Sequence, residues 1–180
     1  MDPPWMEQGG GKCKRGADRH YDLMPTKDMP AAIREMECWA DLGEDCHLYM
    51  WVTNNFLPDG LWLIEQLQFC YKTNLVWIKD RYGLGRYFRG RHELCLFATR
   101  GNGWSNRTEN NSISSVIEAK RGRHSAKPES FYELIEQRSH GPYLEIFARE
   151  ARPAWKSYGN QLPDYVPVEK PQLPLFPGPT

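Results

Sequence analysis

Residues 2–5 read DPPW. The fold is predicted from this tetrapeptide together with the order of the segments that follow it in the chain. Asp2 offers a carboxylate, while Pro3 has a fixed φ and no N–H and therefore holds a backbone carbonyl in a set direction. Trp5 supplies a large flat ring. On these four residues alone, a proline turn beside a hydrophobic anchor is an equally good interpretation.

The two acceptors of DPPW suit one demanding reaction. The exocyclic amine of adenine is a poor nucleophile, because its lone pair is delocalised into the ring. An enzyme that methylates this amine must accept hydrogen bonds from both amine protons, a task that fits Asp2 and the carbonyl held by Pro3. Trp5 offers a face on which an extruded base could stack.

The composition limits the class of protein. The chain has 180 residues, 40% of them apolar and 26% charged, which is typical of one soluble globular domain. The formal net charge is zero, so no general attraction to nucleic acid or membrane follows from the total. The five cysteines match neither a metal knuckle nor a disulfide framework, and His92-Glu93 lacks the second histidine of a zinc peptidase motif. We therefore predict reduced thiols, no metal and a cytoplasmic location, because no apolar run approaches the ~20 residues that cross a bilayer.

Segments of strand character alternate with segments of helical period, which predicts an α/β fold. In the helix that begins at Pro58, Leu61, Ile64, Leu67 and Trp62 are expected to face inward. The predicted helices cover residues 29–39, 58–69 and 130–137, and the predicted strands cover 47–53, 74–79, 92–99, 116–119 and 143–148. From residue 163 onward six prolines in eighteen residues predict a disordered tail.

Two basic segments predict contact with nucleic acid. Residues 79–91 (KDRYGLGRYFRGR) hold five cations and one anion, with Tyr82, Tyr87 and Phe88 between them, a mixture that binds phosphates and stacks on bases. Lys120, Arg121 and Arg123 form a second cluster. A solvated loop whose charge is offset by nearby acids is the alternative.

Seven blocks of the chain give a more specific signal when they are taken in order: DPPW, YDLMPTKDM, HLYMWVTN, NLVWIKD, HELCLFATRG, HSAKPESFYELIE and YLEIFARxxRPAWxxYGNQ. With them the chain resembles the DPPW-type adenine N6-methyltransferases, a family that includes the catalytic subunit of the eukaryotic messenger-RNA adenosine methyltransferase and many bacterial and phage DNA enzymes. The resemblance implies a Rossmann-like fold that uses S-adenosylmethionine, with a mixed sheet flanked by helices. It covers residues 1–162, which we expect to form the methyltransferase domain.

The resemblance also implies roles for single residues. The catalytic cluster would be Asp2, Pro3, Pro4 and Trp5. The cofactor would be held by Lys127 at its methionine carboxylate, by Glu145 and Arg149 at the end of a strand, and by Asn160 and Gln161 at its ribose hydroxyls. The predicted nucleic-acid contacts are Tyr21, Lys79, Arg81, Arg86, Tyr87, Arg89, Arg91 and Glu93, with Tyr21 and Glu93 near the target base.

The tail contains QLPLF at residues 172–176, which resembles the peptide by which bacterial replication proteins bind the DNA sliding clamp. Leu173, Leu175 and Phe176 would fill an apolar pocket while Gln172 makes a polar contact. This tail and the small size of the chain favour DNA over RNA as substrate. An RNA methyltransferase, and a scaffold subunit that kept the fold and lost catalysis, stay open as alternatives.

In the family fold, DPPW follows a central parallel strand and part of the cofactor's adenine pocket lies upstream. Here only Met1 stands before Asp2. We therefore expect an incomplete sheet and weak or absent activity of this chain alone. Either the sequence begins late, or another segment or subunit fills the gap.

Overall fold

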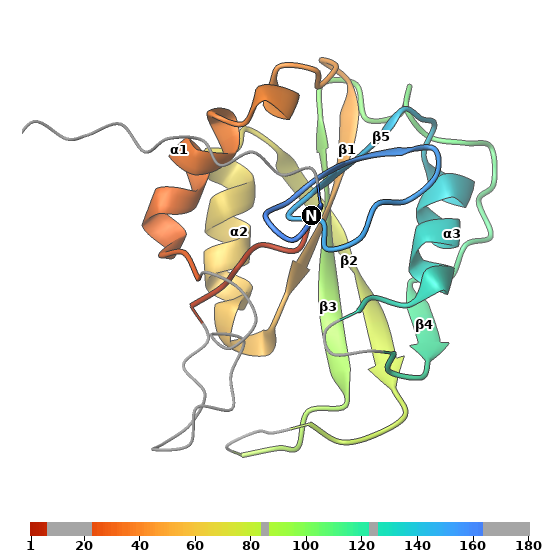
Figure 1. Ribbon diagram of the computed structural model, residues 1–180. Coiled ribbons are helices and arrows are strands. Elements are labelled where there is room, and N and C mark those ends of the chain that lie inside the picture. The colour runs from red at the N-terminus through yellow and green to blue at the C-terminus, as the bar shows by residue number, and fades with distance from the viewer. Residues whose placement is uncertain (7–22, 84–86, 123–125, 164–180) are drawn as a thin grey trace, which may run out of the picture.

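The computed structural model describes residues 1–6, 23–83, 87–122 and 126–163, and within them six strands form two sheets (Figure 1). The larger sheet has the order β1-β3-β2-β4, and the smaller one pairs β5 with β6. The strands are β1 (Cys46–Val52), β2 (Cys70–Lys79), β3 (His92–Arg100), β4 (Val116–Ala119), β5 (Tyr143–Ile146) and β6 (Trp155–Tyr158).

Strand directions in the larger sheet are mixed. β3 runs antiparallel to both β1 and β2, while β2 and β4 are parallel. The last five residues of β1 are all buried, as expected for a strand that is covered on both faces. The mixed sheet with its flanking helices confirms the predicted fold class.

Helices cover both faces of this sheet. α1 (Met29–Arg34) and α2 (Leu57–Gln66) lie on one side and α3 (Glu129–Arg138) on the other (Figure 1). Short 3-10 turns occupy Thr26–Asp28, Glu37–Trp39 and Asn54–Phe56. Because successive strand residues point to opposite faces, Met50 of β1 packs in the core beside α1 and α2, and Trp51 packs in the core beside α3.

Several predicted boundaries are confirmed and others are wrong. β4 has the predicted bounds, β3 extends one residue further than predicted, and β1 begins and ends one residue earlier than predicted. The helix predicted over 29–39 ends at Arg34, because Met36 is extended with a ψ of 130°. β6 was not predicted. The structure contains no helix, among its described residues, that is long and apolar enough to span a membrane.

The second helix is shorter than predicted, and the strand after it is longer. Gln68 has a φ of +63°, and the N–H groups of Gln68 and Phe69 bond back to Glu65 and Ile64. This is a Schellman cap built on glutamine where glycine is usual, so no residue type in the sequence marks the end of the helix. The prediction of the inward face of this helix was also partly wrong. Leu63 is fully buried, whereas Leu61 is 40% exposed and Trp62 is 38% exposed.

Candidate active site

The DPPW segment forms a tight turn that is fixed to β1. The Trp5 N–H donates to the Pro3 carbonyl at 2.8 Å, and the Met24 N–H donates to the Pro4 carbonyl at 2.9 Å. The indole N–H of Trp5 donates to the Trp51 carbonyl at 3.0 Å. A carbonyl oxygen has two lone pairs, so the Pro3 oxygen can still accept a second hydrogen bond.

Trp5 does not offer an open face to a base, so that prediction is wrong. Its side chain is only 4% exposed, belongs to the core, and stacks on Phe56 with ring centroids 5.6 Å apart. Pro3 and Pro4 are buried as well. Trp5 therefore anchors the turn so that Asp2 and the Pro3 carbonyl have a fixed position.

The Asp2 carboxylate is held by two cations that come from distant parts of the chain. Lys127, just before α3, places its ammonium 3.3 Å from the carboxylate, and Arg149, just after β5, donates to it at 3.2 Å. The exposed fractions of the side chains are 18% for Asp2 and 9% for Lys127, so water screens this contact little.

Glu93 extends the contact into a longer series. Its carboxylate lies 3.1 Å from the Lys127 ammonium and accepts from Lys79 at 2.7 Å. Lys79–Glu93–Lys127–Asp2–Arg149 is thus a continuous ion-pair chain. Glu93 was predicted near the target base, and the structure places it one lysine away from Asp2.

The ion-pair chain keeps Lys127 and Glu93 charged although both side chains are largely buried. Burial alone would lower the pKa of the Lys127 ammonium, but Asp2 and Glu93 outweigh it and raise the pKa. Burial alone would raise the pKa of Glu93, but Lys127 and Lys79 outweigh it and lower the pKa. At neutral pH Lys127 and Glu93 therefore remain a charged pair.

The ends of β5 and β6 bring the remaining predicted cofactor residues to one edge. The two strands are parallel, so Arg149 and the exposed Asn160 and Gln161 follow their carboxyl ends. The Ala148 N–H bonds to the Tyr158 carbonyl at 2.9 Å, and a Cβ at Gly159 would lie 2.0 Å from the Ala148 oxygen. This role of Gly159 was not predicted, and its place directly before Asn160 was the only signal for it in the sequence.

Glu145 is positioned by a residue that the sequence analysis also missed. The Tyr132 hydroxyl of α3 donates to the Glu145 carboxylate at 2.9 Å. Burial, together with the charge of Glu145, raises the pKa of Tyr132. Tyr132 therefore stays a protonated donor and fixes the carboxylate.

The donor groups at this edge fit S-adenosylmethionine by their chemistry. Lys127 and Arg149 are cations suited to a carboxylate, and the amides of Asn160 and Gln161 carry the donors and acceptors that ribose hydroxyls need. The close approach at Gly159 fixes the loop that carries the two amides.

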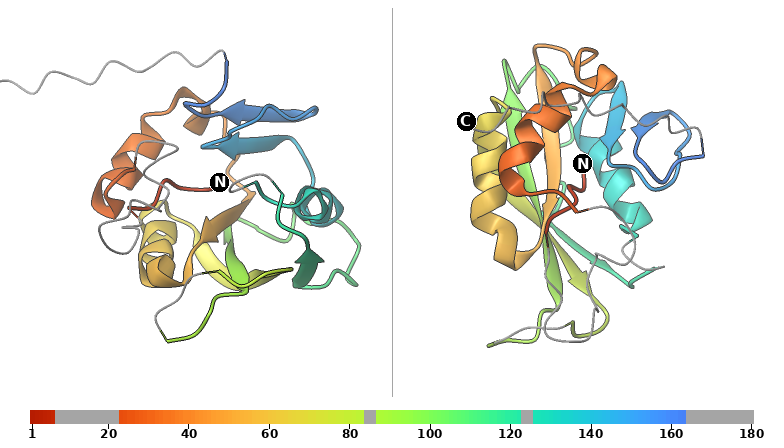
Figure 2. Two further views of the ribbon diagram at one scale, coloured as in Figure 1. Left: turned by 60° about the horizontal axis from the view of Figure 1, so that its bottom comes forward. Right: turned by 60° about the vertical axis from the view of Figure 1, so that its left-hand side comes forward.

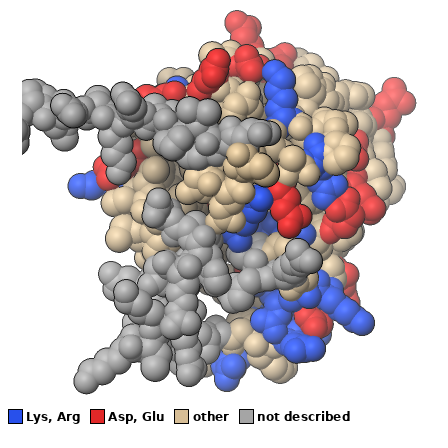
Figure 3. Space-filling model, viewed as in Figure 1, with Lys and Arg blue, Asp and Glu red and all other residues tan. Residues whose placement is uncertain are grey.

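The two predicted basic segments become neighbours through the parallel pairing of β2 with β4. This pairing puts Lys79 opposite Ala119, so Lys120 and Arg121 lie beside Asp80. Lys and Arg gather at the lower right of Figure 3, below the larger sheet. The described cations of this basic surface are Lys79, Arg81, Arg89, Arg91, Lys120 and Arg121.

Exposed aromatic rings accompany the basic surface. Tyr87 is 94% exposed, Phe88 90% and Tyr82 64%. Asp80 offsets part of the charge through Arg81 at 3.4 Å and Arg121 at 3.8 Å. Tyr21, Arg86, Arg123, Gln172, Leu173, Leu175 and Phe176 lie outside the described residues.

Comparison with known proteins shows the family to which the chain belongs. The MT-A70 family matches residues 1–161. The chain belongs to the MT-A70 family. It is 28% identical over 184 residues to the Type II methyltransferase M.MunI of a Mycoplasma species, an alignment that covers 91% of this chain and 76% of that protein. This membership confirms the resemblance carried by DPPW, and the chain is an adenine methyltransferase that acts on nucleic acid.

Proposed function

We propose that this MT-A70 protein transfers a methyl group from S-adenosylmethionine to the 6-amino group of adenine in DNA. The observation that carries the proposal is the position of Asp2, whose carboxylate ends the part of the ion-pair chain that starts at Lys79 in the basic surface. A continuous series of ion pairs therefore joins the proposed acceptor for the amine to the proposed surface for the phosphates.

Asp2 and the Pro3 carbonyl would act on the amine by accepting hydrogen bonds from its two protons. This draws the nitrogen toward tetrahedral geometry and localises its lone pair for attack. The buried Trp5 keeps both acceptors in place, which saves reorganisation during the reaction. No strong general base is needed, because the proton can leave after the new bond has formed.

Lys127, Arg149, Asn160 and Gln161 would hold the cofactor. When bound, S-adenosylmethionine supplies a methyl group on a positively charged sulfur. Lys127 and Arg149 can bind a second carboxylate, that of the cofactor, only if their contacts with Asp2 loosen. That exchange would free the lone pairs of Asp2 for the amine, so we propose that the cofactor binds before the base.

The basic surface supports a nucleic-acid substrate, and two further observations favour DNA over RNA. The basic surface has exposed rings beside its cations, which suits a flipped base and its neighbouring phosphates. The tail carries the clamp-like QLPLF. The similarity to a Type II methyltransferase points the same way.

Radiolabelled methyl transfer to matched single- and double-stranded DNA and RNA tests the proposal. We expect label in adenine of DNA above the background of Asp2→Ala, and an equally low signal from Asp2→Asn, which keeps the shape but loses the charge. Label in RNA alone would refute the DNA assignment. Calorimetric titration with S-adenosylmethionine distinguishes the methyltransferase from the scaffold alternative, because a scaffold subunit should give no heat of binding.

A further inference from the structure

The connection between β2 and β3 carries the most exposed large rings of the described residues. Tyr87 is 94% exposed and Phe88 is 90% exposed, and Tyr82 follows at 64% among the rings of this connection. A tyrosine hydroxyl remains in water at little cost, whereas a phenylalanine ring has no polar atom and is stabilised when it is covered. Because Phe88 is accompanied by two further rings, it is not a single scattered apolar residue, and this surface is one that a partner covers.

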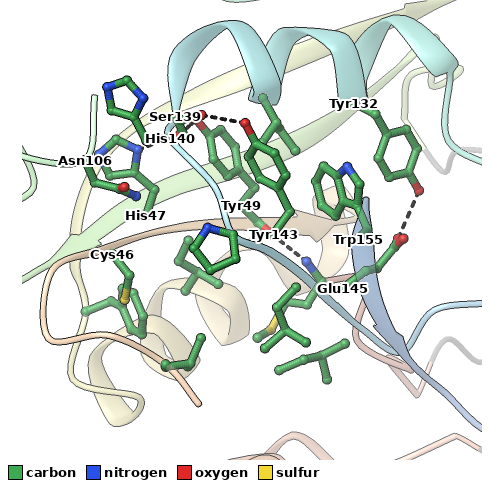
Figure 4. A pocket seen from close by; sticks show the side chains of 18 of the residues that line it. Cys46, His47, Tyr49, Asn106, Tyr132, Ser139, His140, Tyr143, Glu145 and Trp155 are labelled. Carbon is green, nitrogen blue, oxygen red and sulfur yellow. Dashed lines mark hydrogen bonds between the residues drawn. The ribbon is translucent and has the colours of Figure 1, made fainter. Parts of the chain in front are cut away.

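This connection projects from the body of the protein. In Figure 1 it extends below the larger sheet, past the lower ends of α2 and α3, and both views of Figure 2 show the same projection. The cavity between β1 and β5 lies elsewhere and borders the proposed cofactor edge, since Tyr49, Tyr132 and Glu145 line it (Figure 4). Residues 79–83 and 87–91 are not among its lining residues, so the exposed rings are separate from that edge.

Four hydrogen bonds brace the described part of the connection. The Lys79 N–H donates to the Arg91 carbonyl at 2.8 Å, and the Gly83 N–H donates to the Gly90 carbonyl at 2.6 Å. The Nε–H of Arg89 donates to the Gly83 carbonyl at 2.7 Å, and the Nε–H of Arg91 donates to the Lys79 carbonyl at 2.9 Å. Because these bonds already cross between its two sides, less conformational entropy is lost when a partner fixes the exposed rings.

The charged groups around Phe88 favour a polyanion over a protein as the partner. Arg89 and Arg91 follow it in the chain, and the side chain of Arg81 is 79% exposed. A guanidinium has five N–H donors, so Arg89 and Arg91 can brace the connection and still bind phosphates. The cores of protein–protein interfaces are depleted in charged residues, whereas phosphates attract cations. Nucleic acid is therefore the partner whose chemistry fits this surface.

The base of the connection is joined to the proposed reaction site. Lys79, at the end of β2, contacts Glu93 at 2.7 Å, and the ion-pair chain continues from Glu93 to Asp2. Phe88 precedes Arg91, whose backbone is bonded to Lys79, by three residues, and three residues of chain span at most about 11 Å. The ring is thus carried near the acceptor for the amine without being part of it.

We propose that Phe88 is a wedge, an apolar side chain that enters duplex DNA beside the target adenine and stacks in the space that the flipped base leaves. The inference rests on the proposed function, because a base inside a duplex must be extruded before Asp2 can bind its amine. Insertion of an apolar side chain partly unstacks the neighbouring bases and so opens the duplex at that step. Arg89 and Arg91 would hold the phosphates beside the opened step.

Methyl transfer to one DNA sample, assayed as duplex and again after heat denaturation, tests the wedge. Single strands need no opening, so Phe88→Ala should keep most of the parent's kcat/KM on denatured DNA and lose roughly tenfold or more on duplex. Phe88→Leu, which restores an apolar wedge, should recover most of the duplex activity. Trp104→Ala, which removes an exposed ring elsewhere, should equal the parent on both forms. An equal loss on both forms, or no loss on duplex, would overturn the proposal.

Binding to an abasic duplex separates this inference from the methyltransferase assignment, because it needs no methyl transfer. Fluorescence anisotropy compares two duplexes of one sequence, one of which lacks a single central base. The vacant position accepts the ring without the cost of unstacking, so the intact chain should bind this duplex roughly fivefold tighter, and Phe88→Ala should bind both equally. A parent without this preference, or the same preference in Phe88→Ala, would refute the wedge whatever the methylation result. An intact preference without methyl transfer to any DNA would refute the proposed reaction but not insertion of the ring.

Discussion

Lys127 lies 3.3 Å from the Asp2 carboxylate, although 125 positions separate the two residues in the sequence. The ammonium of Lys127 is nine-tenths buried and also faces Glu93. One lysine thus pairs with both carboxylates, and its removal would leave them largely buried with less compensation.

Lys127→Met is therefore expected to destabilise the fold as well as cofactor binding. Removing one partner of a buried ion pair costs about 3–5 kcal/mol, and the exposed edge of this cluster places the expected loss near the lower value. Urea unfolding followed by tryptophan fluorescence measures it. Lys156→Met, which breaks the exposed pair with Asp41, is the control and should leave the midpoint unchanged. Equal midpoints for both variants would contradict the importance of the cluster.

The stability of the protein should fall in acid partly because of Glu93. The cations lower the pKa of this carboxyl below its ordinary value of 4.5, so the folded state binds fewer protons than the unfolded state in that region. The stabilisation is complete above pH 4.5 and is lost as the pH falls through the lower folded pKa. Glu93→Gln should be less stable at pH 7 and show a flatter decline below pH 4.5 than the parent, by urea unfolding across pH. A matched Glu109→Gln, at an exposed position, should keep the parent's slope.

Gly159→Ala should lower cofactor affinity. Its new Cβ would lie 2.0 Å from the Ala148 carbonyl oxygen, so the loop that carries Asn160 and Gln161 must move. We expect at least a tenfold weaker affinity for S-adenosylmethionine by calorimetry. Gly43→Ala is the control, because its Cβ would meet its nearest atom at 3.7 Å, an ordinary contact. Unchanged affinity in Gly159→Ala would show that this loop does not bind the cofactor.

Tyr87→Ala should weaken nucleic-acid binding without changing stability. The ring is 94% exposed, so it contributes nothing to the core, and stacking on a base is worth about 1–3 kcal/mol. Fluorescence anisotropy with single-stranded DNA should show a loss of roughly fivefold or more. Trp104→Ala removes another exposed ring, at 71% exposure, outside the basic surface and should have no effect.

Arg81→Ala should reduce the slope of the logarithm of nucleic-acid affinity against the logarithm of salt concentration by about one.

The tail should bind a bacterial sliding clamp through QLPLF. A labelled peptide of residues 163–180 is expected to bind the clamp by fluorescence anisotropy, and Phe176→Ala should abolish binding because its ring would fill the apolar pocket. Glu169→Ala, outside the motif, serves as the matched control. Failure of the parent peptide to bind would remove this proposal and leave the methyltransferase assignment intact.

Features that depend on local chemistry and on order along the chain could be predicted from the amino-acid sequence. DPPW carries its acceptors in four adjacent residues, and the apolar pattern at residues 47–53 is that of a strand in any context. Together with the resemblance carried by the seven ordered blocks, these features predicted an α/β adenine methyltransferase, and the match to the MT-A70 family confirms it. The ranges of β1, β3 and β4 followed for the same reason.

Which of these residues come into contact follows from the packing of distant segments and could not be predicted from the sequence. The burial of Trp5 under Phe56 depends on packing, which a short motif does not encode. The contact of Glu93 with Lys127 and the pairing of β2 with β4 depend on strand register, and the same holds for the cavity beside Tyr49. Register is set by the sum of many weak contacts between distant segments, so no single stretch of the sequence reveals it.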